Sequence, residues 1–424
     1  MASSLKASTR GLEIVNRARK KKGWTKTMTV AWWETANTSQ ATLRRFWRGL
    51  AIQPDAFIGI CKAIGISNWE EIVERITDEE AEEEILPKQP QDWGEAPDVS
   101  VFYGRTEELS QLEQWIVNDR CRLVALLGIE GIGKTALSVM LADQLQSEFD
   151  CLIWRSLRYA PSLEQLLGEV LQFLSNKEPA QLPNDTGAKI SQLIDYLRMH
   201  RCLLILDEVE TILRSGAIAG QYREGYEGYG ELFRRIADQQ HQSCLVLTSS
   251  EKPKDIASRE GDTLPVRCLQ LKGLKDAEAC EIFTAKGLAD PHHWEHLLQM
   301  YLEGHPLFLN IVSSAIKESF NGKVSEFLKY NTFFLGDIRG VLEIPFSRLS
   351  SLEKEIMGQL ASNENLISLP TLKEKLSSAI SMSELIEALE SLSRRSLIEK
   401  HIESNTIFYT LQPVIMKYVK TQFY

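Results

Sequence analysis

Four residues, Gly128, Gly133, Lys134 and Thr135, have the types and the spacing that binding a phosphate chain requires. Within the segment RLVALLGIEGIGKTALSVMLADQL they fit the pattern G-x-x-x-x-G-K-[ST]. The glycines let backbone N–H groups curl around phosphate oxygens, the lysine adds a positive charge, and the threonine hydroxyl can ligate Mg²⁺. The apolar run before the pattern predicts a strand, and the amphipathic run after it predicts a helix whose positive end faces the anion. The predicted nucleotide-binding residues of this loop are Gly128, Gly131, Gly133, Lys134, Thr135 and Ala136.

Two acids at the end of a second apolar run could supply the metal chemistry that such a loop needs. In RCLLILDEVETIL the apolar stretch ends at Asp207 and Glu208. Beside a phosphate-binding loop, Asp207 would hold Mg²⁺ together with Thr135. Glu208 would orient and deprotonate the attacking water if hydrolysis occurs, with Lys134 as the second catalytic residue. Strands also end in exposed acids that have no such role, so this prediction depends on the upstream loop.

The elements around these residues are typical of a parallel sheet flanked by helices. Short apolar runs alternate with longer segments of helical period from about residue 99 onward, the pattern of βαβ units. After about Leu274 the pattern is almost wholly helical, up to a strand-like piece at 407–410. The sequence shows no internal repeat of about 20 to 50 residues. The expected strands are 122–127, 151–155, 202–206 and 244–247.

The length of 424 residues predicts several domains, since it exceeds what one hydrophobic core usually organises. The stretch TDEEAEEEILPKQPQDWGEAPD, an acidic run followed by prolines and a glycine, is typical of a linker. We predict a multidomain α/β protein. Its expected parts are a small all-α domain at 1–76, a linker at 77–98, a phosphate-binding α/β domain at 99–274, a helical domain at 275–340 and a last domain at 341–424.

Composition and cysteine usage favour a cytoplasmic protein. The seven cysteines are odd in number, scattered and mostly set in apolar runs, so neither a disulfide framework nor zinc-ligand spacing is present. The N-terminus MASSLKASTRG is polar, which does not fit a secretory signal. No apolar run reaches the length of about 18 residues that a membrane-spanning helix needs, so no membrane partner is expected.

Charge is distributed unevenly along the chain. Residues 1–50 hold eleven Lys or Arg and two acids, a balance of +9, whereas the whole chain carries −10 and the remainder therefore −19. A basic N-terminal region (residues 1–50) on an otherwise acidic chain predicts an anionic partner for this region, with nucleic acid as the first candidate. The alternative from charge alone is a solvated, lysine-rich helix face.

From about Val99 to the C-terminus the sequence resembles the NB-ARC or STAND class of P-loop ATPases. This class occurs in apoptosome proteins, plant resistance proteins and multidomain bacterial regulators, including regulators of cyanobacterial type. VFYGRTEEL is similar to the opening motif of the class, LEGHPLFL to its G-x-P motif, and SCLVLTSS to the strand whose end senses the γ-phosphate. The resemblance implies that Phe102, Gly104 and Arg105 lie beside the adenine and ribose, and that Pro306 packs on the adenine base.

The resemblance also implies that residues 341–424 are a winged-helix domain with a hairpin near IEKHIESNTIFYTL. The match has one departure at the phosphate site. Ser250 stands where the class commonly has an arginine that contacts the terminal phosphate. Arg155 and Lys252 are the expected substitutes, and Arg155 is therefore included among the predicted nucleotide-binding residues.

A second departure concerns the ADP-bound state. The histidine and aspartate that clamp ADP in many relatives fall at Gln412 and Pro413 of YTLQPVIMKYV, which implies a looser ADP lock. His305 is a lone histidine beside the proline of the G-x-P motif. Such a histidine is more often structural than catalytic, so we assign it no chemistry.

The basic N-terminal region is similar to a helix-turn-helix domain of the Cro and repressor class. A helical stretch ending in AWWETAN, a turn TSQ and a second helix ATLRRFWRG precede further helical segments. In this interpretation polar side chains of the second helix meet bases, and its arginines meet phosphates. The alternative is that the same small bundle is a protein-interaction module. The DNA-binding candidates are Gln40, Thr42, Arg44, Arg45 and Arg48.

Taken over the whole chain, the resemblance implies a two-state switch. ADP would hold a closed monomer, exchange for ATP with Mg²⁺ would open it, slow hydrolysis would reset it, and the open form would self-associate. Relatives normally continue into repeats that sense a trigger, so a chain stopping at Tyr424 implies that another protein supplies the sensor or that it has been lost. Three functions stay open: a switch acting on DNA, a switch recruiting an effector protein in a defence or cell-death pathway, and a plain P-loop ATPase.

Overall fold

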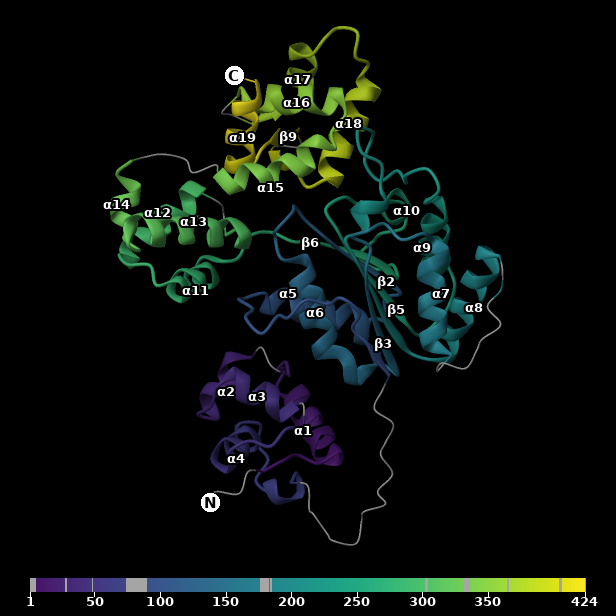
Figure 1. Cartoon of the computed structure of the whole chain (residues 1–424), viewed down its shortest axis with the longest axis vertical. Helices are drawn as coiled ribbons and strands as arrows, with labels where there is room; N and C mark the ends of the chain where they lie inside the picture. Colours follow the sequence, from purple (N-terminus) through teal and green to yellow (C-terminus); the bar gives the residue numbers. More distant parts are fainter. Residues whose placement is uncertain are drawn as a thin grey trace. The chain divides into compact units, whose positions relative to one another are not determined.

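The computed structural model of the chain describes residues 5–26, 29–47, 49–73, 90–175, 183, 185–301, 304–330, 336–363, 366–403 and 406–423. They belong to two compact units, one formed by residues 1–88 with 106–112 and the other by residues 89–105 with 113–424. Figure 1 colours the chain from purple at the N-terminus to yellow at the C-terminus. Within the described ranges, no helix is long and apolar enough to cross a membrane.

The N-terminal unit is a small helical bundle built around aromatic side chains. Trp32, Phe46 and Phe57 are buried, and the Trp32 indole N–H donates to the carbonyl oxygen of Ile60 at 3.1 Å. The first helix begins after Ser8, whose side chain caps it. The elements are α1 (Thr9–Lys21), α2 (Val30–Thr35), α3 (Gln40–Trp47), α4 (Pro54–Ala63), the 3₁₀ turn Trp69–Glu71 and, up to Leu112, α5 (Thr106–Glu113).

A six-stranded parallel sheet organises the second unit. The strands are β1 (Gln91–Asp92), β2 (Leu123–Leu127), β3 (Cys151–Ser156), β4 (Cys202–Asp207), β5 (Cys244–Ser249) and β6 (Val266–Gln270). Their order is β1-β3-β4-β5-β2-β6, so β5 lies between β2 and β4. Because every neighbouring pair is parallel, all carboxyl ends share one edge, where α/β proteins bind ligands.

Helices bury both faces of this sheet. They are α6 (Lys134–Leu145), α7 (Leu163–Leu174), α8 (Thr186–Met199), α9 (Glu227–Asp238) and the short α10 (Lys254–Ala257). Leu123, Ala125 and Leu127 of β2 share a core with Leu166 of α7 and Phe233 of α9, as the period of two along a strand requires. Figure 1 shows α6 on one side of the sheet and α7, α8 and α9 on the other.

A helical segment follows the sheet. Its elements are α11 (Asp276–Lys286), α12 (Trp294–Tyr301), α13 (Pro306–Phe320) and α14 (Val324–Leu328). The helix α13 is central, since it packs against α11 and α14. It buries Phe308, Val312 and Ile316, a spacing of four residues that places them on one face.

The C-terminal segment (residues 336–423) combines helices with a small antiparallel sheet. Its helices are α15 (Gly336–Ser347), α16 (Ser351–Ala361), α17 (Leu369–Lys375), α18 (Met382–Arg394) and α19 (Pro413–Phe423). Its strands are β7 (Ile367–Ser368), β8 (Glu399–Glu403) and β9 (Thr406–Thr410), in the order β7-β9-β8. The register pairs Ile402 with Ile407 across the β8–β9 hairpin.

The structure confirms the four predicted strands as β2 to β5 and the strand-like piece near 407–410 as β9. The strands β1 and β6 were not predicted. Residues 77–89 of the expected linker lie outside the described residues. Within the described remainder, Gln91 and Asp92 pair with β3, so this part of the predicted linker adds a two-residue strand to the edge of the sheet.

Candidate functional site

The phosphate-binding loop connects the end of β2 to α6, as its pattern predicts. Gly131 and Gly133 have φ angles of 78° and 99°, in the left-handed region that favours glycine. Gly133 is the N-cap of α6, so the free N–H groups of the helix N-terminus open onto the loop. The buried Lys134 side chain donates from Nζ to the carbonyl oxygens of Gly128 at 2.9 Å and Ile129 at 3.1 Å.

Thr135 and Asp207 meet at the carboxyl edge of the sheet. The Thr135 hydroxyl donates to both carboxylate oxygens of Asp207, at 2.9 and 3.1 Å. Thr248, near the end of β5, also donates to Asp207, at 2.5 Å. Sequence reasoning missed Thr248, although its place at the end of the apolar run CLVLTS put it at the same edge. The structure therefore brings together the two residues predicted to hold Mg²⁺ and adds a third that orients the carboxylate.

Burial raises the pKa of Asp207 to about 6, although the hydrogen bonds from Thr248 and Thr135 act in the opposite direction. The residue is 3% exposed, so its charge lacks the solvation that water would give. A divalent cation would offset this cost. Carboxylate and hydroxyl oxygens are also the ligands that Mg²⁺ prefers, so Thr135 and Asp207 fit the predicted ion by their chemistry.

Glu208 follows Asp207 in the left-handed conformation, with a φ of 60°. Its N–H donates to the Thr248 hydroxyl at 3.0 Å. Its carboxylate accepts from the Ser156 hydroxyl at 3.2 Å and lies 3.6 Å from Nε of Arg158. These contacts place the Glu208 side chain toward the end of β3, at the same edge of the sheet as Asp207.

A pocket of about 540 Å³ adjoins the phosphate-binding loop. Its wall comes from the segment before α5, from the loop and first turn of α6, and from the helical segment. The lining residues are Val101, Phe102, Tyr103, Arg105, Ile132, Gly133, Ala136, Leu274, Ile282, Ala285, Lys286, Pro306 and Asn310. A mostly apolar pocket of this volume suits a planar base and a sugar. Five residues predicted to bind nucleotide line it, namely Phe102, Arg105, Gly133, Ala136 and Pro306.

Arg105 and Gly104 shape the pocket from the opening motif. Arg105 is buried with a φ of 63°, and its Nη2 donates to the carbonyl oxygen of Ile132 at 3.0 Å. Gly104 has a φ of 62°, and a Cβ there would lie 2.3 Å from Cδ of Glu278. Both residues thus hold the opening motif close to its neighbours, and the described contact of Arg105 is with the loop backbone.

His305 joins α13 to the phosphate-binding loop. Its Nε2 lies 3.0 Å from the carbonyl oxygen of Glu130, so this nitrogen carries the proton and donates. Its Nδ1 accepts from the N–H of Phe308 at 3.4 Å and caps α13. Burial lowers the pKa of His305 to about 3, so the ring is neutral near neutral pH. These contacts make His305 structural, and Pro306 follows it into the pocket wall.

The two expected substitutes for the missing arginine do not line the pocket. Arg155 donates to Asp92 at 2.5 Å, and its Nε lies 3.4 Å from Glu169. The strand β3 that carries Arg155 is separated from β2 by β4 and β5, which explains its distance from the phosphate-binding loop. Lys252 donates from Nζ to Glu260 at 2.7 Å. The structure therefore does not bring Arg155 together with the other predicted nucleotide-binding residues.

The positions of the expected ADP clamp lie in the C-terminal segment. Gln412 donates from Nε2 to Glu399 at 3.3 Å, and Pro413 begins α19. Neither residue lines the pocket. The polar partner of Gln412 is thus another residue of the C-terminal segment.

Of the predicted DNA-contacting residues, Gln40, Thr42, Arg44 and Arg45 belong to α3 in the N-terminal unit, and Arg48 lies outside the described residues. Ser39 accepts from the N–H of Thr42 at 3.1 Å, a typical cap of a helix start. Arg45 is exposed, and its Nη2 donates to the carbonyl oxygen of Ala51 at 3.2 Å. The candidates whose side chains lie outside the described part are Gln40, Arg44 and Arg48.

Comparison with known proteins shows that the chain is similar to one protein family and to several individual proteins. Residues 105–292 match the NB-ARC domain. An uncharacterized WD repeat-containing protein of Nostoc sp. is 42% identical over 99% of this chain, which covers 36% of that protein. The disease resistance protein RRS1B of Arabidopsis thaliana is 29% identical over 45% of this chain and 13% of its own length. The chain thus spans well under half the length of these relatives.

Among solved structures, the Walker-type ATPase of Pyrococcus abyssi is similar in fold. The TM-score is 0.51 at 19% sequence identity, and the match covers 75% of this chain and 96% of that protein. At this identity the likeness concerns the fold alone. It agrees with the parallel sheet and flanking helices described above.

Proposed function

We propose, on the premise that residues 105–292 form an NB-ARC domain, that this chain is a switch operated by ADP and ATP with Mg²⁺. The observation that carries the proposal is the convergence of Lys134, Thr135 and Asp207 beside an apolar pocket of about 540 Å³. Phosphates would lie on the loop and the N-terminus of α6, and the base would lie against Phe102 and Pro306.

Each residue of the site has a task in this proposal. The Nζ of Lys134 neutralises the terminal phosphates, and the N–H groups at the start of α6 bind phosphate oxygens. Thr135 and Asp207 would hold Mg²⁺, which supplies charge stabilisation to the phosphate chain when it is bound. Glu208 would orient and deprotonate water, and its contacts with Ser156 and Arg158 position its carboxylate. Because no arginine of the end of β5 contributes, hydrolysis is expected to be slow.

The helical segment and the C-terminal segment would be the moving parts. We assign residues 275–340 as the helical domain and residues 341–424 as a winged-helix domain, supported by α16 to α18 and the β8–β9 hairpin. A ligand shifts such an equilibrium only by its difference in affinity for the two states. The triphosphate would therefore act chiefly as a conformational signal, with self-association of the open form.

The first test is the identity of the nucleotide that the purified protein carries, released by denaturation and separated by chromatography. We expect ADP in the native protein and none in Lys134→Ala, because the variant lacks the charge that faces the phosphates. Lys189→Ala is the matched control, since Lys189 and Lys134 are both 7% exposed and Lys189 pairs with Glu164 at 2.9 Å. A native protein that neither carries nor binds ADP or ATP would contradict the proposal.

For the N-terminal unit we infer a DNA-binding role, with α2 and α3 as a helix-turn-helix. Its support is the balance of +9 over residues 1–50 together with the exposed Arg45 on α3. The second candidate is recruitment of an effector protein through the same bundle. The similarity to the disease resistance protein RRS1B favours this second candidate, and nucleotide-dependent co-assembly without DNA affinity would mark it.

A further inference from the structure

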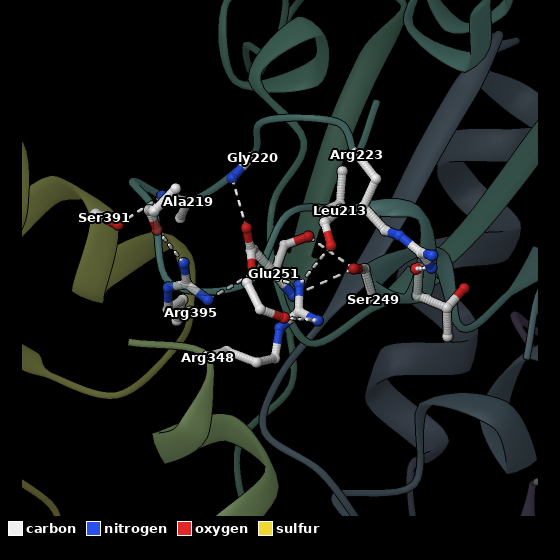
Figure 2. A network of polar contacts seen from close by, with 12 residues as sticks. Leu213, Ala219, Gly220, Arg223, Ser249, Glu251, Arg348, Ser391 and Arg395 are labelled. Atoms are coloured by element: carbon white, nitrogen blue, oxygen red, sulfur yellow. Dashed lines mark hydrogen bonds and ion pairs between the residues drawn. The ribbon is translucent and has the colours of Figure 1, made fainter. Parts of the chain in front are cut away.

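Buried charged side chains join the nucleotide-binding sheet to the C-terminal segment, and Figure 2 shows Glu251, Arg348 and Arg395 at their centre. Glu251 is 1% exposed and Arg395 is 3% exposed. Glu251 follows β5, whereas the two arginines belong to the C-terminal segment. Charges buried to this degree are costly unless they are paired and hydrogen-bonded. Their partners therefore help to decide whether the segment stays docked.

One carboxylate serves both arginines. Oε2 of Glu251 accepts from Nη1 of Arg395 at 2.7 Å and from Nη2 of Arg348 at 3.1 Å. Its Oε1 accepts from the N–H of Gly220 at 2.6 Å. Glu251 thereby connects the end of β5, the loop after β4 and the C-terminal segment at one point.

The arginines continue these contacts to the loop after β4. Arg395 donates from Nη2 to the carbonyl oxygen of Ala217 at 2.6 Å and from Nε to Glu353 at 3.3 Å. Arg348 donates from Nη2 to the carbonyl oxygen of Leu213 at 3.2 Å. The Arg395 guanidinium is thus held by acceptors on both sides of the contact, whereas the described acceptors of Arg348 lie on the sheet side.

Backbone amides of the sheet loops also donate across this contact. Three of them bond to the C-terminal segment and provide probes of docking, because a bonded amide exchanges its hydrogen only when the contact opens. The pairs are Gly216 N–H to Arg348 O at 2.8 Å, Lys252 N–H to Arg394 O at 3.0 Å and Ala219 N–H to Ser391 Oγ at 2.7 Å.

The end of β5 connects Glu251 to Asp207, the proposed Mg²⁺ ligand. Thr248 donates to Asp207 at 2.5 Å. The next residue, Ser249, donates from its hydroxyl to the carbonyl oxygen of Glu251 at 2.6 Å and accepts from the Glu251 N–H at 3.1 Å. All four residues are buried. A shift of this strand end therefore moves the carboxylate that holds both arginines.

A buried ion pair is better suited to a contact that must open than to one that only stabilises the fold. Desolvation offsets much of the attraction between the charges, so an apolar contact of the same size would hold the segment as well or better. The pair is strong only while the guanidinium fork and the carboxylate are aligned. A small movement of Glu251 therefore separates a docked arrangement from a released one.

We propose that Glu251 is a latch, which holds the C-terminal segment to the nucleotide-binding sheet through Arg348 and Arg395 and releases it when the nucleotide moves the end of β5. The proposal rests on the proposed function, since it assigns the regulation of the same site. It places the control of opening next to Ser250, which lies inside the turn that Ser249 forms with Glu251.

The test is amide hydrogen exchange of the full chain, measured by mass spectrometry without nucleotide, with ADP, and with Mg²⁺ and a non-hydrolysable ATP analogue. In Glu251→Gln we expect peptides that contain Gly216, Ala219 and Lys252 to exchange at least about tenfold faster than in the native protein, without nucleotide. In the native protein we expect the ATP analogue, but not ADP, to accelerate exchange in the same peptides.

Glu260→Gln is the matched control. Glu260 accepts from Lys252 at 2.7 Å in the same loop region and makes no described contact with the C-terminal segment, so native exchange is expected. Arg395→Lys is a second variant in case Glu251→Gln does not fold. It keeps a charge but loses the guanidinium fork, and a smaller acceleration in the same peptides is expected.

The outcomes separate the two proposals. Native exchange of these peptides in a folded Glu251→Gln protein would overturn the latch, whatever the nucleotide does. Unchanged exchange in the native protein, while the ATP analogue protects the peptide containing Lys134, would overturn its control by nucleotide. Failure of ADP and of the ATP analogue to protect that peptide would instead overturn the proposed function. The comparison of Glu251→Gln with the native protein without nucleotide would still test the latch.

Discussion

The position of Asp207 at the end of β4 brings its carboxylate to the Thr135 hydroxyl but also buries it, and burial of the charge is unfavourable in the absence of a cation. The carboxylate accepts hydrogen bonds from two hydroxyls and has no described cationic partner within salt-bridge distance, so burial dominates and raises its pKa to about 6. Under the proposed function, a bound metal ion would offset the stability that this burial costs.

This opposition gives a prediction for Asp207→Asn. The raised pKa means that the folded state binds more protons than the unfolded state between about pH 4 and pH 6, so the contribution of Asp207 to stability falls as pH rises through this window. At pH 7 without nucleotide, the variant should be more stable by about 2–3 kcal/mol. Thermal unfolding at pH 4 and pH 7 measures the difference, which should vanish at the lower pH.

With Mg²⁺ and nucleotide the order should reverse. The native protein gains stability from the bound ligand, whereas Asp207→Asn loses the ion's carboxylate ligand and should gain much less. Equal stabilisation of both proteins by Mg²⁺ and nucleotide would show that Asp207 does not hold the ion. Asp185, an exposed helix cap that accepts from Ala188 N–H at 2.8 Å, offers Asp185→Asn as a control.

At the residue scale, the site could be predicted wherever one motif fixes both the residue type and its place on an element. Lys134 and Thr135 were selected by the loop motif that follows the apolar run of β2, and Asp207 by its place at the end of the apolar run of β4. Arg155 was selected by analogy of position, and its actual partners come from β1 and α7, which no local pattern specifies. The contacts of Glu251 could not be predicted for the same reason, because its partners are distant in sequence.

Among the elements, α13 and its N-cap residue directly contact the phosphate-binding loop. His305 at its start donates to Glu130 of the loop and caps the helix, and a Cβ on Gly131 would come within 2.5 Å of Leu307. The loop and the helix therefore fit each other without spare space. Movement of the helical segment and the shape of the loop should be coupled.

The pKa of His305 gives a prediction for His305→Asn, which keeps a good helix cap but does not titrate. With a pKa lowered to about 3, the folded state binds fewer protons than the unfolded state between pH 3 and 6.5. The contribution of His305 is therefore fully present above pH 6.5 and is lost as pH falls. Between pH 7 and pH 5 the native protein should lose about 2 kcal/mol more than the variant.

Measuring both proteins at each pH removes the opposite contribution of Asp207, because both contain that residue. Denaturant unfolding monitored by tryptophan fluorescence provides the free energies. Parallel stability curves for the two proteins over pH 5–7 would contradict a buried neutral His305. The nucleotide affinity of the variant, measured at pH 7, reports separately on the bond from His305 to the loop.

The elements themselves could be predicted to differing degrees. The strands β2 to β5 are apolar runs with buried residues on both faces, so the sequence alone marks them. The strand β6 lies at an edge and carries a half-polar pattern, and β1 consists of two polar residues. Both depend on a neighbouring strand for their hydrogen bonds, and local sequence holds no signal for such pairing.

At the scale of the whole molecule, the charge asymmetry leads to a prediction about DNA. Binding of the full chain to labelled duplex DNA, followed by fluorescence anisotropy, should weaken as salt rises. In the double variant Arg44→Ala and Arg45→Ala, the slope of log K against log salt should be lower by about 2, because two phosphate contacts are lost.

Arg17→Ala is the control for this experiment. Arg17 lies in the same unit, has a side chain that is 78% exposed, and pairs with Glu13 at 3.8 Å. It should leave the slope near the native value. A native protein without measurable DNA affinity at low salt would contradict the DNA-binding role and favour the effector-recruiting alternative.

The small sheet of the C-terminal segment has a consequence for handling the protein at high concentration. With the order β7-β9-β8, the strand β8 is an edge whose free backbone groups could pair with another molecule. Four of its five residues are Glu399, Lys400, His401 and Glu403, and these polar side chains oppose such pairing. Ile402, which is 75% exposed, is the exception. Ile402→Lys should therefore raise the concentration at which the protein precipitates while leaving its unfolding temperature unchanged.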